Sequence, residues 1–387
     1  MKRALVFSLV VLSVLTMAKL VVIGPWSGEE QAKFMPVLKA FEKEYGIEVE
    51  YRVYRAEDLA NLLPAQFNAH KSLGDVIFMW AWFIKEQAKK GNVVDLTGVI
   101  SEDDFIPGAL DAVKLNGKIY GISYTGKVKP GFWYRKSFFE KYGLKVPRTW
   151  YEFKALLEKI KGIPGLKAPI ASGDGVGWPL SDVTEHFLIT FGGPTVQKDL
   201  IAGKLKWQSY TVRYAMGKLV ELLKAGYFGE PTEWTMALKQ WWNGDYALYF
   251  MGSWITGMVD DPEDLGVFSL PGCKGVVFGA DYAFVPKYSK NLDDAIKLIK
   301  FLATKGQIVQ VKQGGHIATY KGVSLNDYPP VDKEVAKILQ GAEALPDLDD
   351  SVGGAFQKAF WDQLKLLWVK PDRLDDVLEV LDEKMEE

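Results

Sequence analysis

The chain has 387 residues, more than one ordinary hydrophobic core holds, so we expect roughly two to three domains. A net charge of −2 argues against a nucleic-acid partner, because proteins that bind nucleic acids are commonly basic. Hydrophobic residues make up 48% and charged residues 25% of the chain, the balance of a globular protein, whereas the 13 tryptophans are unusual.

The first 18 residues are typical of a secretory signal peptide. Lys2 and Arg3 form a positive n-region, and residues 5–15 form an apolar segment too short to span a bilayer. We therefore expect an exported protein that is periplasmic or extracytoplasmic and associated with the cell surface. An uncleaved signal peptide would tether the protein there. Cys273 is the single cysteine, so the chain can form no internal disulfide and no cysteine metal cluster.

The first half of the mature chain alternates strands and helices. Residues 19–24 and 47–53 predict strands. The helix between them begins at a predicted capping box of Ser27 and Glu30 and carries an apolar stripe at helical spacing. Two strands joined by a helix in this way run parallel. A third strand over 75–79 completes a βαβαβ unit.

Tryptophan follows two of these strands. Trp26 comes after the first strand, and Trp80 and Trp82 come after the third. Because ligands bind beyond the carboxyl ends of strands in open α/β sheets, these rings are candidate ligand contacts. Asp75, at the start of the third strand, and Glu29, in the segment after the first, are candidate partners for ligand hydroxyls.

The middle of the chain predicts a hairpin, a linker and a second series of strands and helices. Asn116 and Gly117 lie between short alternating runs, as in a type I′ hairpin turn. Residues 125–131 are rich in turn residues and lack periodicity, so we predict a linker there. The further strands are expected over 132–134, 169–171, 265–270 and 276–285, and the helices over 138–142, 182–191, 212–225 and 234–242.

The run 246–251 is apolar throughout, which is typical of a strand buried on both faces. A glycine-serine pair ends this strand, and Trp254 follows at its carboxyl end. Two more rings, Trp178 in a glycine-rich turn and Trp133 in the strand over 132–134, are candidates of the same kind. Asp281 places a carboxylate inside the strand over 276–285.

The last part of the chain predicts a loop and three helices. The loop opens with glycines and contains Gly315 and His316. Pro286 and the segment 322–328 mark possible crossings between domains, in addition to the linker that starts at Thr125. The three helices are expected over 331–341, 356–368 and 373–385.

Enzyme signals are weak, whereas a carbohydrate-binding pattern is present. None of the three histidines has zinc-protease spacing, and there is no G-x-S-x-G nucleophile elbow. Glycosidase-type carboxylate pairs stay open as an alternative. The scattered tryptophans match the needs of a sugar, whose C–H face packs on an aromatic ring while its hydroxyls need donors and acceptors. Core packing is the alternative for each ring.

With these pieces placed, the chain resembles the family 1 extracellular solute-binding proteins of ABC importers, the group that includes maltose-type sugar receptors. The resemblance covers nearly the whole mature chain and depends on the order of several loose motifs. They are Phe41 to Val49, Asp75–Val76, Asn116 to Ile122, Trp133 to Leu144 with Pro147 to Trp150, and Asn243 to Trp254. Arg135 and the segment 315–318 depart from the family's usual residues, and the lipoprotein cysteine is missing.

The resemblance implies an α/β protein with the two-lobed, type II-like periplasmic-binding-protein fold. Each lobe would be a mixed sheet flanked by helices, with ligand in the cleft between the lobes. The expected divisions are 1–18 for the signal peptide, 19–125 plus 286–325 for the N-terminal lobe and 126–285 plus 326–387 for the C-terminal lobe.

The implied function is capture of a carbohydrate, closure of the hinge and delivery to the permease subunits of an ABC transporter. We expect a monomer with no catalysis, cofactor, metal or nucleic-acid partner. A receptor for a polyol or polyamine is the first alternative, and a secreted glycoside-active enzyme is the second. The expected ligand-binding residues are Trp26, Glu29, Asp75, Trp80, Trp82, Tyr124, Trp133, Trp178, Trp254, Asp281, Gly315 and His316.

Overall fold

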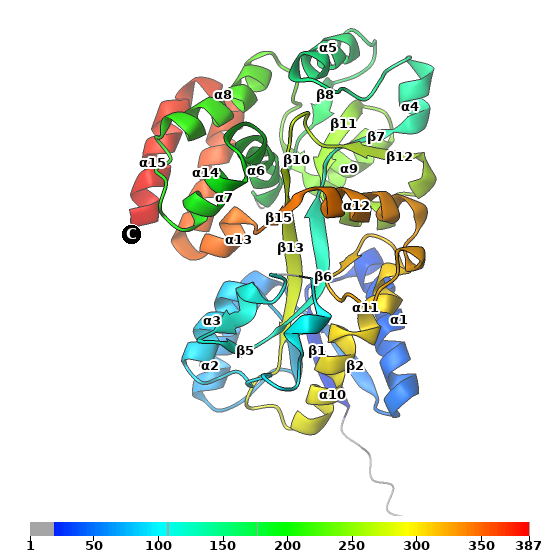
Figure 1. Cartoon of the computed structure of the whole chain (residues 1–387), viewed down its shortest axis with the longest axis vertical. Helices are drawn as coiled ribbons and strands as arrows, with labels where there is room; N and C mark the ends of the chain where they lie inside the picture. Colours follow the sequence, from blue (N-terminus) through cyan, green and yellow to red (C-terminus); the bar gives the residue numbers. More distant parts are fainter. Residues whose placement is uncertain (1–18, 107, 176, 387) are drawn as a thin grey trace, which may run out of the picture.

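Figure 1 shows the computed structural model, which describes residues 19–106, 108–175 and 177–386. The chain forms two α/β lobes, drawn one above the other in Figure 1 and joined by the long strands β6 and β13. This confirms the predicted two-lobed α/β fold. The predicted signal peptide, residues 1–18, lies outside the described residues. Among the helices of the described part, none has the length and hydropathy to cross a bilayer.

The larger sheet belongs mainly to the lower lobe of Figure 1 and has the strand order β14-β6-β13-β3-β1-β2, with β15 paired to β13. Strand β1 runs parallel to both β2 and β3, as the βαβαβ prediction requires. Strand β13 runs antiparallel to β6 and contains a bulge between Ala280 and Tyr282. The strands are β1 (Leu20–Gly24), β2 (Val49–Val53), β3 (Val76–Phe78), β6 (Ile122–Lys129), β13 (Gly275–Phe284), β14 (Ile317–Ala318) and β15 (Glu343–Leu345).

Helices cover the larger sheet on both sides (Figure 1). They are α1 (Gly28–Tyr45), α2 (Ala56–Asn68), α3 (Ala81–Lys89), α10 (Leu292–Ala303) and α11 (Lys305–Val311). Two short strands, β4 (Lys114–Leu115) and β5 (Lys118–Ile119), form the predicted hairpin, whose turn residues Asn116 and Gly117 both have positive φ. Short 3-10 helices lie at η1 (Glu102–Asp104) and η2 (Asp111–Val113).

The second sheet lies in the upper lobe of Figure 1 and has the order β12-β7-β11-β8. Its strand β11 (Tyr246–Met251) is buried along its whole length between β7 and β8, as the apolar run predicts. The other strands are β7 (Gly131–Arg135), β8 (Ala168–Ala171) and β12 (Leu265–Phe268), and β9 (Gly173–Asp174) pairs with β10 (Thr232–Glu233) outside the sheet.

Ten α-helices of the described chain complete this lobe and its contacts with the first. They are α4 (Lys136–Lys141), α5 (Trp150–Lys161), α6 (Trp178–Gly192), α7 (Pro194–Ile201), α8 (Tyr210–Lys224), α9 (Trp234–Trp242), α12 (Pro330–Gly341), α13 (Leu348–Val352), α14 (Gly354–Val369) and α15 (Leu374–Glu386). The remaining 3-10 helices are η3 (Ser253–Gly257), η4 (Pro262–Asp264), η5 (Leu325–Asp327) and η6 (Pro371–Arg373).

Each lobe has its own hydrophobic core. One core combines residues between 20 and 124 with residues between 283 and 303, and the other combines residues between 132 and 270 with residues between 348 and 381. Each core therefore draws on separate stretches of the chain. The predicted boundaries of the lobes stay a prediction.

Two local predictions are wrong. The predicted linker over 125–131 is largely strand: β6 continues to Lys129 because its backbone pairs with β13 along this stretch. The predicted capping box does not form, because the Ser27 side chain makes no cap hydrogen bond and only its carbonyl accepts one, from the Gln31 N–H. The helix α1 still begins one residue after Ser27.

Candidate functional site

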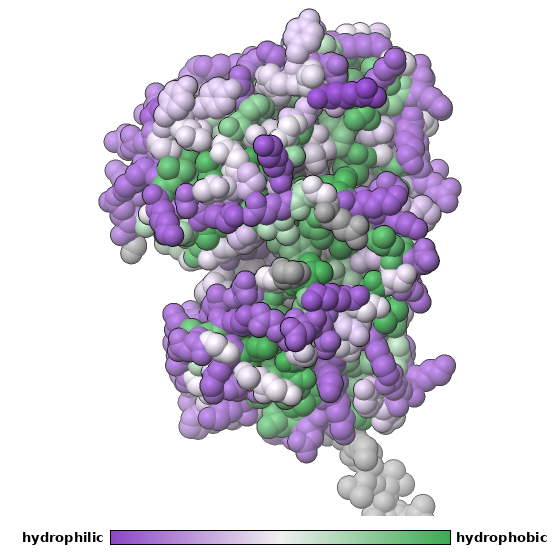
Figure 2. All heavy atoms as spheres, viewed as in Figure 1, coloured by the Kyte–Doolittle hydropathy of each residue, from purple (hydrophilic) through white to green (hydrophobic). Residues whose placement is uncertain are grey.

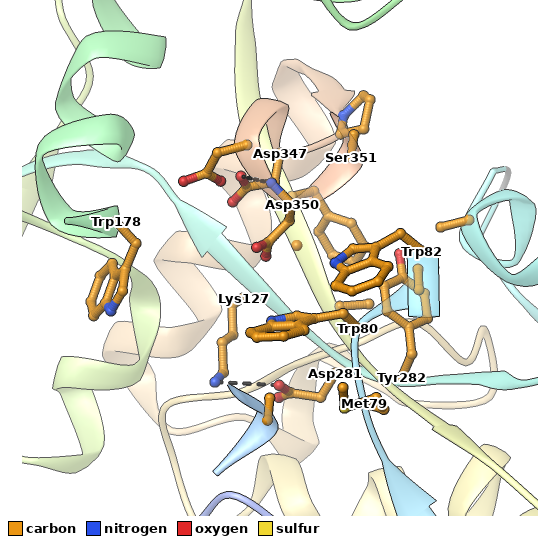
Figure 3. A pocket seen from close by; sticks show the side chains of 18 of the residues that line it. Met79, Trp80, Trp82, Lys127, Trp178, Asp281, Tyr282, Asp347, Asp350 and Ser351 are labelled. Atoms are coloured by element: carbon orange, nitrogen blue, oxygen red, sulfur yellow. Dashed lines mark hydrogen bonds and ion pairs between the residues drawn. The ribbon is translucent and has the colours of Figure 1, made fainter. Parts of the chain in front are cut away.

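A cavity of about 820 Å³ is lined by residues of both lobes and of the two strands that join them. Its volume is typical of a site that encloses a small-molecule ligand of several rings, for which cavities run from about 300 to 1,000 Å³. Figure 2 shows hydrophilic residues over most of the visible face and an indented waist between the lobes. We call this cavity the cleft, and Figure 3 shows the side chains of 18 of the residues that line it.

One wall of the cleft carries a pair of stacked tryptophans from the first lobe. Trp80 is the N-cap residue of α3, and Trp82 is the second residue of that helix. Because β3 leads directly into α3, the strand end delivers both rings to the cleft. Their ring centroids are 5.7 Å apart at an interplanar angle of 20° (Figure 3). The pair is a broad, flat apolar platform.

The second lobe contributes three tryptophans from three elements. Trp254 lies in η3, directly after β11, while Trp178 and Trp234 are the first residues of α6 and α9. Trp178 contacts the other two rings edge to face, with centroids 5.5 Å from Trp254 and 5.6 Å from Trp234. Gly252 is required at the bend, because a Cβ there would overlap the Trp254 ring. The cleft thus has a second aromatic platform.

Charged side chains from the joining strands and α1 line the cleft beside these platforms. Lys127 of β6 and Asp281 of β13 form an ion pair, with 3.3 Å between Nζ and Oδ1 (Figure 3). Burial raises the pKa of Asp281 and of Glu30, and the nearby Lys127 ammonium opposes both shifts. Among the described residues, the buried Asp281 Oδ2 and Trp26 Nε1 have no hydrogen-bond partner. These groups can accept from and donate to ligand hydroxyls.

A buried ion cluster closes the cleft on the side of the second lobe. Lys129 of β6 contacts the carboxylates of Asp182 and Asp347, and burial raises the pKa of Asp182 to about 8 against the attraction of Lys129. Three carboxylates, those of Asp182, Glu185 and Asp347, come within 4.8 Å of one another. The lysine ammonium already supplies the positive charge that a metal ion would bring, so the cluster is an internal ion pair network.

Six of the twelve predicted ligand-binding residues line the cleft. They are Trp26, Trp80, Trp82, Trp178, Trp254 and Asp281. The chain therefore brings together side chains that are up to 255 positions apart, from Trp26 to Asp281. Trp26 is 3% exposed and packs edge to face on Phe78, so most of its ring belongs to the core of the first lobe.

Three of the other predicted residues are held away from the cleft by bonds inside their own lobe. Asp75 accepts hydrogen bonds from the Val21 N–H at 2.8 Å and the Ser289 hydroxyl at 2.7 Å, and so joins two strands and a loop. Trp133 is fully buried and donates from Nε1 to the Met251 carbonyl at 2.7 Å. Tyr124 is also buried, and its hydroxyl donates to Gln310 Oε1 at 2.9 Å.

The remaining three lie near the cleft but do not line it. Glu29 is exposed, whereas its neighbour Glu30, one position further along α1, faces the cleft. Gly315 packs behind Trp254, because a Cβ at Gly315 would lie 2.9 Å from the Trp254 carbonyl oxygen. His316 is buried with Nδ1 3.0 Å from the Thr125 hydroxyl, and burial lowers its pKa to about 3.

Several lining residues were not predicted. They are Glu30, Lys127, Lys129, Trp234, Tyr282, Asp347, Asp349, Asp350 and Trp361, among others. The alternation of Lys127 and Lys129 within an apolar stretch was a usable signal, because in a strand it places both lysines on one face. The acidic residues 347–350 carried no such signal: only the fold brings them to the cleft, ahead of and within α13.

Comparison with known proteins places the chain in a family. An uncharacterized ABC transporter extracellular-binding protein of Pyrococcus horikoshii is 60% identical over 94% of this chain and 87% of its own length. The alpha-glucosides-binding periplasmic protein AglE of Rhizobium meliloti is 30% identical over 88% of this chain and 81% of its own. The maltose-bound structure of MalE3 from T. maritima superposes with a TM-score of 0.79 at 21% identity, over 95% of this chain and 99% of that one.

The family profile agrees with these relatives. The profile described as bacterial extracellular solute-binding protein matches residues 25–309, which include β6, β11 and most of the cleft. The profile describes extracellular solute-binding proteins, and the P. horikoshii relative is named as the extracellular-binding protein of an ABC transporter. The chain belongs to the bacterial extracellular solute-binding protein family and is the solute-binding component of an ABC transporter.

Proposed function

We propose that the solute of this transporter component is a carbohydrate, a mono- or oligosaccharide. The observation that carries the proposal is the pairing of two tryptophan platforms, from opposite lobes, with buried polar atoms that have no partner in the described chain. Indole faces attract the partly positive C–H groups of a pyranose, and hydroxyls need the charged donors and acceptors beside them. Few other solutes need both surfaces together.

The relatives support the same ligand class. The R. meliloti relative, which is 30% identical over most of both chains, is named for binding alpha-glucosides. The cleft of about 820 Å³ has room for more than one sugar ring, and its two platforms are built by different lobes. A sugar that touches both platforms therefore favours the conformation in which the lobes are close together.

The proposed cycle uses binding without chemistry. The protein, a monomer outside the cytoplasm and held at the cell surface, captures the sugar, closes and delivers it to the permease subunits. It needs no cofactor or metal for this. Binding energy from stacking and hydrogen bonds has to exceed the cost of closing the lobes and of removing water from the charged groups of the cleft.

A cationic solute such as a polyamine is the second candidate. Asp347, Asp349 and Asp350 line the same cavity as the stacked pair Trp80 and Trp82 (Figure 3). Indole faces and carboxylates together are what an organic cation needs. Lys129 already neutralises part of this charge, which is why we rank the carbohydrate first.

A thermal-shift screen tests the proposal. The panel contains glucose, galactose, maltose, maltotriose, cellobiose, glycerol and spermidine. A sugar at 100 times its Kd adds about 2.7 kcal/mol to the free energy of unfolding, which raises Tm measurably. A rise in Tm with a sugar supports the proposal, and a rise in Tm with spermidine alone favours the polyamine hypothesis. Release of reducing sugar from a bound glycoside would contradict a purely binding role.

A further inference from the structure

A buried carboxylate lies behind Trp254 and outside the cleft. Asp332 belongs to the first turn of α12, is 1% exposed, and is not among the described residues that line the cleft. A carboxylate in such a place is costly unless several donors bind it. The hydrogen-bond donors to Asp332 therefore indicate its structural role.

The donors to Asp332 come from two segments that are distant in sequence. The Thr256 hydroxyl donates to Asp332 Oδ1, and Thr256 lies two residues after Trp254 within η3. The Gly315 N–H is 3.2 Å from both carboxylate oxygens. Asp332 thus joins the turn that carries the Trp254 ring to the loop that contains Gly315.

The loop at Gly315 presses directly on the Trp254 backbone. Gly315 has a φ of +83°, a conformation that favours glycine. A Cβ at this position would lie 2.9 Å from the Trp254 carbonyl oxygen and 3.2 Å from its Cα. The position of the loop therefore limits where the backbone of Trp254 can lie.

The first lobe reaches the same place through Lys33 of α1. Its Nζ donates to the Gln313 carbonyl at 2.7 Å, two residues before Gly315. Its aliphatic chain lies beside Gly257, the last residue of η3, where a Cβ would be 3.1 Å from Lys33 Cε. The loop, the Trp254 turn and a helix of the opposite lobe therefore meet around one carboxylate.

We propose that Asp332 is a positioning residue that fixes the Trp254 ring in the cleft by tying η3 to the loop at Gly315. It touches no ligand and acts through Trp254. The role of the Trp254 ring in ligand binding rests on the proposed carbohydrate function, whereas its positioning by Asp332 can be measured without any sugar. A negative sugar screen would therefore contradict the carbohydrate proposal alone, and a negative result with the Asp332 variants would contradict the positioning proposal alone.

Acrylamide quenching of the Trp254 fluorescence tests the proposal on the full chain. The contribution of this ring is the difference between a protein and the same protein with Trp254→Phe. Asp332→Ala removes the hydrogen bonds from both donors, Thr256 and Gly315, so we expect the ring to become more accessible and its quenching constant to rise. Asp332→Asn keeps an acceptor oxygen and restores quenching close to the original value. Glu334→Ala, an exposed change on the same helix, leaves quenching unchanged.

Two outcomes overturn the proposal. One is an Asp332→Ala variant that melts cooperatively and shows the original quenching constant. The other is Asp332→Asn behaving like Asp332→Ala, since a purely electrostatic role would give that result. If Asp332→Ala does not fold, Thr256→Val decides, because it keeps the carboxylate and removes the hydroxyl that donates to Asp332 and lies 3.0 Å from the Ser253 carbonyl oxygen. A rise in quenching in that variant supports the proposal, and an unchanged constant overturns it.

Discussion

The Trp254 ring both lines the cleft and packs among buried side chains. It lines the cleft but is only 8% exposed, with Trp178 at its edge. We expect Trp254→Leu to weaken binding of the sugar found in the screen by about tenfold, because the aromatic face is lost. It also lowers the free energy of unfolding by about 0.5–3 kcal/mol, since the ring is packed. Isothermal titration and urea unfolding measure the two effects.

Trp133 provides the matched control for this change. It is also a buried tryptophan with a structural role, but its Nε1 donates to the Met251 carbonyl and it does not line the cleft. Trp133→Leu should therefore lose stability and keep its affinity for the sugar. Equal loss of affinity in both variants would show that Trp254 acts only through the fold.

Two buried histidines predict how stability depends on pH. Burial lowers the pKa of His186 and of His316 to about 3, against an ordinary value near 6.5. Between these pH values the unfolded chain binds more protons than the folded one. The free energy of unfolding therefore falls as pH falls through this range, by up to about 1.4 kcal/mol per pH unit for each histidine.

The His186→Gln variant isolates one of these contributions. His186 Nε2 accepts the Leu270 N–H at 3.1 Å, and a glutamine oxygen can replace this acceptor without gaining a proton. Urea unfolding at pH 7 and pH 5 should show a smaller loss of stability in the variant than in the original protein. The exposed His70, changed to glutamine, is the control and should retain the full loss. An unchanged pH dependence in His186→Gln would contradict the prediction.

The cleft could be predicted where strand ends carry aromatic residues and not where loops carry charge. Trp80 and Trp254 were identifiable because a strand pattern ends just before each of them, and sheet topology fixes which ends meet. Asp75, at the start of the third strand, was also a candidate, yet its carboxylate accepts hydrogen bonds from the Val21 N–H and from two side chains. Tertiary contacts decide which polar groups already have hydrogen-bond partners inside the protein. A local sequence pattern contains no information about tertiary contacts.

At the level of elements, the strands were predictable wherever burial makes them uniformly apolar. Strand β11 is buried on both sides and its predicted and observed bounds agree. Strand β6 was missed because glycine and two lysines interrupt its apolar character. Lys129 can be buried because its ammonium group forms ion pairs with Asp182 and Asp347. Its partners lie 53 and 218 positions away, beyond the reach of any local pattern.

The two lysines of β6 both line the cleft, but the same substitution should cost different amounts of stability at the two positions. Lys129→Met leaves the buried Asp182 and Asp347 without their cation, and loss of one partner of a buried pair costs about 3–5 kcal/mol. Lys127→Met leaves Asp281 without its cation. Because this pair is more open to solvent than the pairs of Lys129, the loss of stability should be smaller than in Lys129→Met. Lys127 faces the cleft, so affinity for the sugar should fall instead. Urea unfolding and titration separate the two, and equal destabilisation by both changes would contradict this assignment.

At the level of the whole molecule, the lobes meet directly through elements that also line the cleft. Helix α13 of the second lobe contacts α3 of the first, and Gly353 lies against the Trp82 ring. A Cβ at Gly353 would lie 3.0 Å from Trp82 Cδ1. This contact belongs to the close arrangement of the lobes, the one that places both tryptophan platforms around the cavity. A change that weakens it should favour separated lobes and so reduce apparent affinity.

Gly353→Ala tests this coupling, and the next residue supplies its control. Gly353 and Gly354 have φ values of +69° and +58°, so alanine strains the backbone at both. Only at Gly353 would the new Cβ meet Trp82, since nothing lies within 4 Å of a Cβ at Gly354. We expect Gly353→Ala to bind the sugar more weakly than Gly354→Ala and to have a larger radius of gyration by small-angle scattering. If the two variants bind and scatter alike, the contact does not contribute to closure, and the aromatic and ionic contacts of the cleft alone hold the lobes together.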